Sequence, residues 1–127
     1  MTFVILGPPR TKKTSNRIVT RKSDGRQFVI PSSANESWTK TAVLQLRSQR
    51  QAAPLDTPVN LTAVVYREKN LGDLIGYLQA IADALETAQV LTNDRLIVGF
   101  NGCRMTKDAA NPRVELTVTE LTTEAEA

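Results

Sequence analysis

The sequence contains no histidine and only one cysteine among its 127 residues. Without histidine, the chain cannot build a Ser-His-Asp triad, a Cys-His dyad or a zinc site with an imidazole ligand. Cys103 has no second cysteine for an internal disulfide and no histidine to activate it, so we interpret it as a small strand residue. Any chemistry must therefore rely on carboxylates, on lysines or on a metal held by carboxylates.

Long apolar runs are absent as well. No run approaches the roughly 18 to 20 residues that a membrane-spanning helix needs, and residues 1–6 lack the pattern of a signal peptide. Hydrophobic residues nevertheless make up 41% of the chain, which is enough to bury a core. We expect one domain over residues 1–127 with a frayed tail at 122–127, no membrane contact and a cytosolic location.

Charge is divided unequally along the chain. Residues 1–50 carry ten Lys or Arg against two acidic residues, whereas residues 51–127 carry six against eleven. A basic half suits a polyanion such as nucleic acid, and an acidic half suits a hard cation. Most of the cations in the first half gather in one stretch, whose members are Arg10, Lys12, Lys13, Arg17, Arg21, Lys22 and Arg26. We interpret this stretch as a phosphate-binding surface, with a solvated loop as the alternative.

Residues 7–14 follow an apolar run and look like a damaged P-loop. Lys12 occupies the place where such a loop needs glycine to let backbone amides wrap a phosphate. The residues after Thr14 favour a strand and a hairpin, whereas a P-loop runs straight into a helix. We therefore expect no nucleotide cofactor.

Hydrophobic periodicity predicts two helices, a hairpin and several strands. Helical stripes occur in residues 34–50 and from residue 74 onward, and Trp38 lies on the first, where a core position is favoured over stacking on a base. The expected strands cover residues 3–6, 59–66, 95–103 and 114–119, with an interruption at Gly99 and Gly102, and the expected hairpin pairs residues 18–20 with 27–30. This order predicts an α+β fold in which two helices pack on a small mixed sheet of about four strands, with the hairpin added.

The second helix stands between acidic residues. Its buried stripe is predicted to contain Leu74, Leu78, Ile81 and Leu85. Asp73 directly precedes the stripe and suits the N-cap, whereas Asp83 points about 180° away from the stripe on the outer face. Asp94 follows a turn and stands at the entrance of the next strand, from which it could fold back toward the other two.

Carboxylates that converge on one pocket repel one another unless a cation holds them. Mg²⁺, or Mn²⁺ in its place, takes oxygen ligands and keeps bound waters, one of which can attack a phosphodiester once deprotonated. A shared pocket of Asp73, Asp83 and Asp94 would therefore suit metal-dependent hydrolysis. In the alternative interpretation they are a helix cap, an exposed polar residue and a turn residue.

The same stretch resembles the active-site motif of the RusA Holliday junction resolvases, a family common in phages and prophages. The matching segments are Asp73-Leu74-Ile75-Gly76, Gln79, Asp83-Ala84-Leu85 and Asn93-Asp94, with Gly7-Pro8-Pro9, Ser15-Asn16-Arg17 and residues 31–38 near the N-terminus. The resemblance runs from residue 3 to about residue 121. It implies a RusA-like fold and a homodimeric, Mg²⁺-dependent endonuclease that cuts four-way DNA junctions in recombination and repair.

Residue roles follow from the same resemblance. It implies that Asp73 and Asp94 bind the metal and that Asp83 supports them in catalysis. The candidate DNA contacts combine the Asn-Arg loop that resembles the family's with other cations of the basic stretch, namely Arg10, Lys12, Lys13, Asn16, Arg17, Arg21 and Lys22.

Four positions depart from the family's motif. Its second aspartate, asparagine, lysine and first paired aspartate are replaced here by Ile75, Gly76, Gln79 and Asn93. Isoleucine in place of a carboxylate removes an oxygen ligand and about one unit of countercharge, which weakens Mg²⁺ binding. Two hypotheses follow: a junction-selective endonuclease, or a DNA-binding module that has the scaffold without cleavage.

Overall fold

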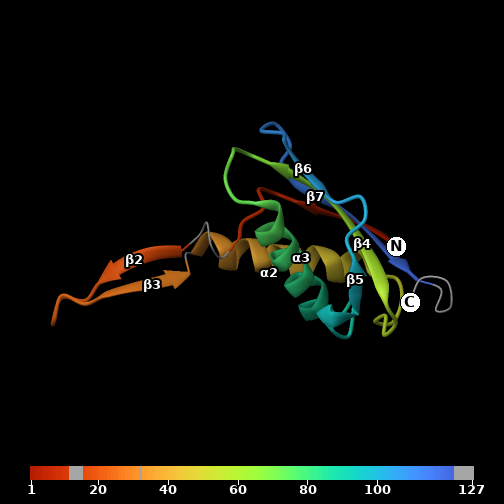
Figure 1. Cartoon of the computed structure of the whole chain (residues 1–127), viewed down its shortest axis with the longest axis horizontal. Coiled ribbons are helices and arrows are strands. Elements are labelled where there is room, and N and C mark those ends of the chain that lie inside the picture. The colour runs from red at the N-terminus through yellow and green to blue at the C-terminus, as the bar shows by residue number, and fades with distance from the viewer. Residues whose placement is uncertain (12–15, 32, 122–127) are drawn as a thin grey trace.

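The computed structural model describes residues 1–11, 16–31 and 33–121. The elements follow the order β1 (Thr2–Leu6), β2 (Asn16–Thr20), β3 (Gln27–Pro31), α2 (Ser33–Gln49), β4 (Val59–Arg67), α3 (Leu74–Thr87), the 3₁₀ helix η1 (Asp94–Leu96), β5 (Ile97–Gly99), β6 (Arg104–Lys107) and β7 (Arg113–Glu120). Figure 1 shows α2 and α3 packed beside the main sheet, with β2 and β3 forming a separate hairpin. The predicted α+β class is confirmed.

The main sheet is mixed and has β4 at its centre. Strand order runs β1-β7-β4, and both β5 and β6 pair with the remaining side of β4. β7 is antiparallel to β1 and to β4, whereas β5 and β6 are parallel to β4. β5 meets the beginning of β4 at Val59 and β6 meets its end at Arg67, so the two short strands occupy successive parts of one edge.

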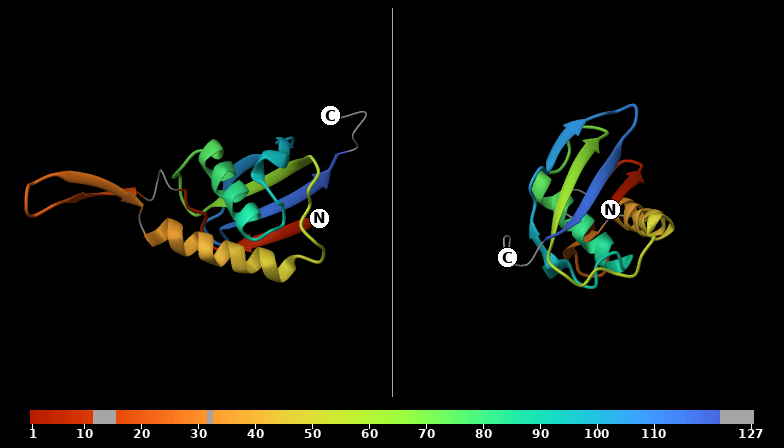
Figure 2. Two further views of the ribbon diagram at one scale, coloured as in Figure 1. Left: turned by 90° about the horizontal axis from the view of Figure 1, so that it is seen from below. Right: turned by 90° about the vertical axis from the view of Figure 1, so that its right-hand side faces the viewer.

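One face of this sheet is covered by the two helices, which also pack against each other (Figure 2). Alternate residues of β4 supply the centre of the core, where Val59, Leu61, Ala63 and Val65 are fully buried. The predicted stripe of α2 is buried, namely Trp38, Ala42, Val43 and Leu46. The predicted stripe of α3 is buried from Leu78 onward, whereas Leu74 is only partly covered. The helical and strand periods of the sequence thus identify the buried faces correctly.

The outer edge of β1 is closed by side chains of α2 rather than by another strand. Gln49 accepts from the Val4 amide at 2.9 Å and donates to the Val4 carbonyl at 2.8 Å. Gln45, one helical turn earlier, pairs in the same way with the amide and carbonyl of Leu6 at 2.8 and 3.1 Å. Because glutamine carries both a donor and an acceptor, two of them at helical spacing satisfy two alternate residues of the strand edge.

The prediction of a single strand over residues 95–103 is wrong. Residues 94–96 form η1, β5 is confined to residues 97–99, and β6 is a separate strand that the sequence did not predict. The predicted interruption at Gly99 and Gly102 is real: a Cβ on Gly99 would lie 2.7 Å from Asn60 Oδ1, and Gly102 has a φ of +86°. The β4 register shifts at this point. A close approach of loop to strand therefore divides the run into two strands.

In the gap between β5 and β6, hydrogen bonds from side chains join the chain to β4 in place of backbone pairing. Asn60 Oδ1 accepts from the Asn101 amide at 2.9 Å, and Thr62 Oγ1 donates to the Asn101 carbonyl at 2.8 Å. Cys103 Sγ accepts from the Ala63 amide and donates to the Leu61 carbonyl, at 3.3 and 3.1 Å. Burial raises the pKa of the Cys103 thiol, which keeps it protonated and able to donate. Cys103 is thus a structural residue beside β6.

The predicted hairpin is confirmed as β2 and β3, which form a sheet of their own. We call residues 16–31 the arm. Its tip is closed by hydrogen bonds from the Arg21 amide to the Arg26 carbonyl at 2.7 Å and from the Gly25 amide to the Arg21 carbonyl at 2.9 Å. In Figures 1 and 2 the arm projects beyond the body formed by the main sheet and helices.

The helices in the described ranges are too short or too polar to cross a bilayer. This agrees with the absence of long apolar runs in the sequence.

Candidate nucleic-acid interface and acidic residues

Asp73 caps the N-terminus of α3, as the sequence predicted. Its backbone is extended, and Oδ1 accepts a hydrogen bond from the Gly76 amide at 2.8 Å. A Cβ on Gly76 would lie 2.7 Å from that oxygen and 3.3 Å from the methyl group of Thr11. Glycine at this position therefore lets the residue 10–11 segment and the capping carboxylate approach the first helical turn together.

Two arginines lie within electrostatic reach of this end of α3. Arg67 Nη1 donates to the Gly72 carbonyl at 3.2 Å, and the Tyr77 hydroxyl donates to the Leu71 carbonyl. Burial raises the pKa of Tyr77 above its ordinary value, the positive charges of Arg67 and Arg10 oppose that rise, and the charge of Asp73 adds to it. No local pattern in the sequence points to Arg67, because its proximity to α3 depends on where β4 ends.

Asp83 and Asp94 lie toward the other end of α3. Asp83 is half-buried and accepts from Gln79 Nε2, one turn earlier on the helix, at 3.1 Å. Asp94 begins η1, and its amide donates to Glu86 Oε1 in the last turn of α3 at 2.9 Å. Asn93 Oδ1 accepts from the Arg95 amide at 2.9 Å and so caps η1. Asp73, Asp83 and Asp94 thus form their hydrogen bonds at different turns of α3.

The structure does not bring Asp73, Asp83 and Asp94 to one point. Glu86, the contact of Asp94, lies thirteen positions beyond Asp73, and at about 1.5 Å per residue the helix separates these positions by about 20 Å. The strands indicate the same separation. Gly72 contacts Arg67 at the end of β4, whereas η1 leads into β5 beside the start of β4.

This separation decides whether a metal fits. The ligand oxygens of Mg²⁺ lie about 2.1 Å from the ion, so two ligands must come within about 4 Å of each other. Asp73 and Asp94 of one chain are much farther apart than that. Among the residues that the structure describes, no group of three His, Cys, Asp or Glu side chains could hold a metal. Within one chain, Asp73 and Asp94 therefore do not form a shared site for the expected ion.

Ile75, which the sequence resemblance compares with the second aspartate of the RusA motif, lies on the surface. Its side chain is 81% exposed in the first turn of α3, two residues beyond the capping aspartate. An isoleucine here buries almost no apolar area, so core packing does not account for it.

The candidate DNA contacts occupy the arm and the segment before it. Arg10 Nη2 pairs with Glu68 Oε2 at 2.9 Å, and its side chain is 21% exposed. At the tip of the arm, Arg21 pairs with Asp24 at 3.2 Å, and Lys22 is exposed. Arg26, which belongs to the same cationic stretch, is exposed beside them.

The remaining candidates are not fully described. Lys12 and Lys13 lie outside the described residues. Asn16 and Arg17 belong to β2, but their side chains also lie outside the described part. The next described element after Thr11 is β2, where a P-loop would enter a helix.

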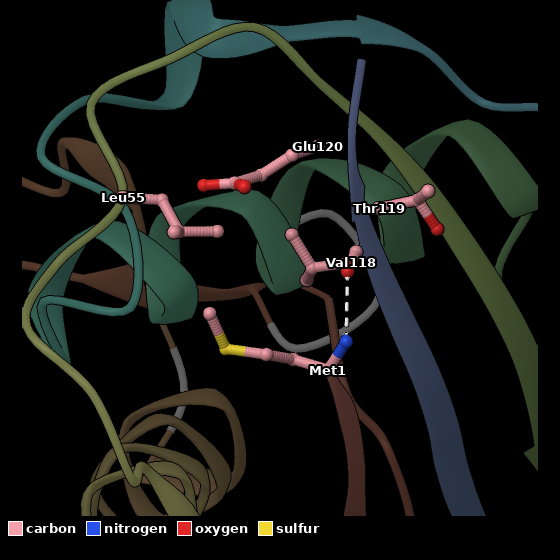
Figure 3. Close-up of a pocket in the computed structure, with 5 residues that line it drawn as sticks. All are labelled: Met1, Leu55, Val118, Thr119 and Glu120. Carbon is pink, nitrogen blue, oxygen red and sulfur yellow. Dashed lines mark hydrogen bonds between the residues drawn. The ribbon is translucent and has the colours of Figure 1, made fainter. Parts of the chain in front are cut away.

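One cavity lies at the opposite end of the sheet from Asp73. It holds about 260 Å³ and is lined by Met1, Leu55, Val118, Thr119 and Glu120 (Figure 3). The N-terminal ammonium of Met1 donates to the Val118 carbonyl at 3.0 Å, which Figure 3 marks with a dashed line. Among the cavity's lining residues only Glu120 carries a carboxylate, so the cavity offers no second carboxylate for a metal, and its cation, the N-terminal ammonium, already donates to Val118.

Comparison with models of known protein families found no match, and comparison with curated proteins found none either.

Proposed function

We propose that this chain binds branched DNA, with four-way junctions as its preferred substrate, as a RusA-like protein. The observation that carries the proposal is the projecting arm, a two-stranded sheet outside the main sheet with Arg21, Lys22 and Arg26 exposed at its tip. A β-ribbon can enter a groove of DNA, and its cations can follow the phosphate backbone.

The distribution of charge supports the same proposal. The cations of the arm and of Arg10 belong to the basic half of the sequence, whereas the carboxylates of α3 and η1 belong to the acidic half. A polyanion is attracted to the first surface and repelled by the second, which orients it on the protein. The resemblance adds a homodimer, which would present two arms to the strands of a junction.

The resemblance also implies cleavage with Mg²⁺ or Mn²⁺. The geometry instead favours a module that binds DNA without cleaving it. Asp73 and Asp94 lie at opposite ends of α3, and Ile75 supplies no ligand between them. We therefore propose selective binding without efficient hydrolysis by the isolated chain.

The test measures binding and cleavage on the same labelled substrates. The protein is titrated by fluorescence anisotropy into a four-way junction and into a linear duplex of the same sequence, over a series of salt concentrations. We expect tighter binding to the junction, a steep linear fall of log K with log[salt], and no product after incubation with Mg²⁺ or Mn²⁺.

A pair of double variants locates the surface. Lys22→Ala with Arg26→Ala removes two cations from the arm and leaves Arg21 to neutralise Asp24. Lys40→Ala with Arg104→Ala removes the same charge from exposed positions on α2 and β6. The first variant should reduce the salt slope by about 0.9 for each phosphate that it no longer neutralises, and the second should leave the slope near the native value.

Two results would contradict the proposal. Equal losses of affinity in both variants would mean that net charge alone drives binding. Equal affinity for junction and duplex would show that the protein does not prefer branched DNA. Product that disappears in Asp73→Asn would instead favour the endonuclease.

A further inference from the structure

The turn between β5 and β6 contains Asn101-Gly102, the chain's only Asn-Gly pair. Both residues are exposed, and Gly102 has a φ of +86°. An asparagine that precedes glycine is chemically labile, because the glycine nitrogen can attack the side-chain amide with no Cβ in the way. The contacts of this turn decide how readily the two groups meet.

The two reacting groups have no other hydrogen-bond partner. Within the described ranges, neither the side-chain amide of Asn101 nor the backbone amide of Gly102 forms a hydrogen bond. An exposed side chain without a partner rotates freely among its rotamers. The side chain of Asn101 can therefore bring its Cγ atom toward the nitrogen of Gly102.

The backbone of Asn101, in contrast, is held against β4. Asn60 Oδ1 accepts from the Asn101 amide at 2.9 Å, and Thr62 Oγ1 donates to the Asn101 carbonyl at 2.8 Å. Asn60 Nδ2 donates to the same carbonyl at 3.3 Å. We call these three hydrogen bonds the clasp. Ring closure requires a rotation about the Cα–C bond of Asn101, and that rotation turns the carbonyl away from Thr62, so the clasp must open first.

We propose that Asn101 is a site of spontaneous deamidation whose rate is limited by the opening of the clasp. The Gly102 nitrogen forms a bond to Cγ of Asn101, and the side-chain nitrogen leaves as ammonia with the proton that the Gly102 nitrogen gives up. Water then opens the five-membered ring at one of its two carbonyls. Opening at one carbonyl gives aspartate, and opening at the other gives isoaspartate, in which the backbone runs through the side chain.

The isoaspartate product changes the sheet. It lengthens the backbone of the turn by one carbon atom, whereas the pairing of β6 with β4 begins only two residues later, at Arg104 opposite Val64. The turn therefore cannot keep both the clasp and the register of β6. Deamidation is then an irreversible change that loosens one edge of the main sheet.

The test follows the modification in the intact native protein. Samples incubated at neutral and at mildly alkaline pH are digested, and mass spectrometry measures deamidation at each asparagine. An isoaspartate methyltransferase assay measures the isoaspartate product. We expect conversion at Asn101 with a rate that rises with pH, because the attacking nitrogen must lose its proton. Asn111 is the internal control, because it is also exposed but precedes Pro112, which has no N–H to react.

A matched pair of variants tests the clasp. Thr62→Val removes the hydroxyl that donates to the Asn101 carbonyl. Thr117→Val makes the same change directly opposite Thr62 on β7, at a residue that is also half-buried. Thr62→Val should deamidate about fivefold faster than the native protein, which is the factor that one hydrogen bond contributes to a local opening equilibrium. Thr117→Val should keep the native rate. Circular dichroism melting confirms that both variants are folded.

A peptide of residues 97–104 gives the rate without the clasp, so the test does not depend on the variants alone. The peptide should deamidate faster than the native protein. Equal rates in peptide and protein, or equal rates in the two variants, would overturn the control by the clasp. An unmodified Asn101 after the peptide has fully reacted would overturn the site itself.

Hydrogen exchange then tests the consequence for the sheet. The amides of residues 104–107 should exchange faster in the isoaspartate form than in fresh protein. Unchanged exchange would contradict the loosening of β6. These outcomes are independent of the proposed function, because none of them measures DNA binding.

Discussion

At the scale of single residues, Asp73 has a structural task that is independent of any metal. Its carboxylate satisfies a backbone amide that the first turn of α3 would otherwise leave without a partner. Such a cap contributes about 1 kcal/mol to stability. Capping the helix is therefore a sufficient reason for an aspartate at this position, and the sequence cannot distinguish that role from a catalytic one.

Ile75→Asp is predicted to preserve or slightly increase stability. The position is 81% exposed, so little packing is lost, and a negative charge in the first helical turn gains about 0.3–1 kcal/mol from the helix dipole. Urea unfolding at low salt measures this change, with Ile75→Asn as the uncharged control. The variant should also produce no junction cleavage, because Asp94 stays at the other end of α3. Cleavage would mean that the active assembly differs from the single chain.

Asp108 is predicted to make stability depend on acid. Arg113, at 3.0 Å, and the Asn111 amide, at 3.2 Å, hold the pKa of Asp108 below its ordinary 3.8. The folded state therefore binds its proton less tightly than the unfolded chain. The stabilisation is fully present above the unfolded pKa and is lost as pH falls through the folded one.

Unfolding free energies of the native protein and Asp108→Asn, measured from pH 7 to pH 3, test this dependence. The variant should be less stable at pH 7, and the difference should shrink as the pH approaches 3. A difference that stays constant over this range would mean that the charge of Asp108 contributes nothing to stability.

At the scale of elements, the closed edge of β1 explains why α2 carries two glutamines on its sheet-facing side. Gln49→Ala should destabilise the protein by about 1 kcal/mol, because it leaves a partly buried amide and carbonyl of Val4 unpaired. Gln45→Ala should cost less, because its bonds to Leu6 are exposed. Urea unfolding measures both.

An unpaired edge is also a site for strand addition. The double variant at Gln45 and Gln49 should therefore associate more readily, as measured by light scattering at rising protein concentration. Gln51→Ala, an exposed glutamine just past the helix, is the control. Equal scattering from the native protein and both variants would show that the side chains do not protect the edge.

Periodicity predicted the elements well where one pattern ran unbroken, as in α2, α3, β4 and β7. It failed over residues 95–103, where the strand is divided. The division depends on Asn60 and Thr62, which lie about forty positions earlier and supply the hydrogen bonds of the interruption. No local pattern contains that information.

At the scale of the whole molecule, the length of α3 decides the candidate site. The turn after α3 leads directly into η1 and then into β5 beside the start of β4, so Asp94 remains near the helix end. The expected convergence assumed that the chain returns toward Asp73, and spacing along the sequence cannot test that assumption.

Mg²⁺ is therefore predicted not to shift the amide NMR signals of Asp73 and Asp94 together. Asp73 lies about 20 Å along α3 from Glu86, the contact of Asp94, which prevents one ion from contacting both carboxylates of a chain. A two-dimensional amide spectrum recorded with and without Mg²⁺ measures the effect, with Asp73→Asn as the control. Joint shifts that disappear in this variant would require a second copy to supply one ligand.

The sequence alone determined which faces are buried, where α3 begins and that the arm is a basic hairpin, because each depends on neighbours within one or two turns of chain. Only the tertiary structure decided that Asp73 and Asp94 lie at opposite ends of α3, that Arg67 lies beside Tyr77, and that Thr62 holds the turn at Asn101. These relations join distant segments, and they are set by where each element ends and by which way the chain turns next.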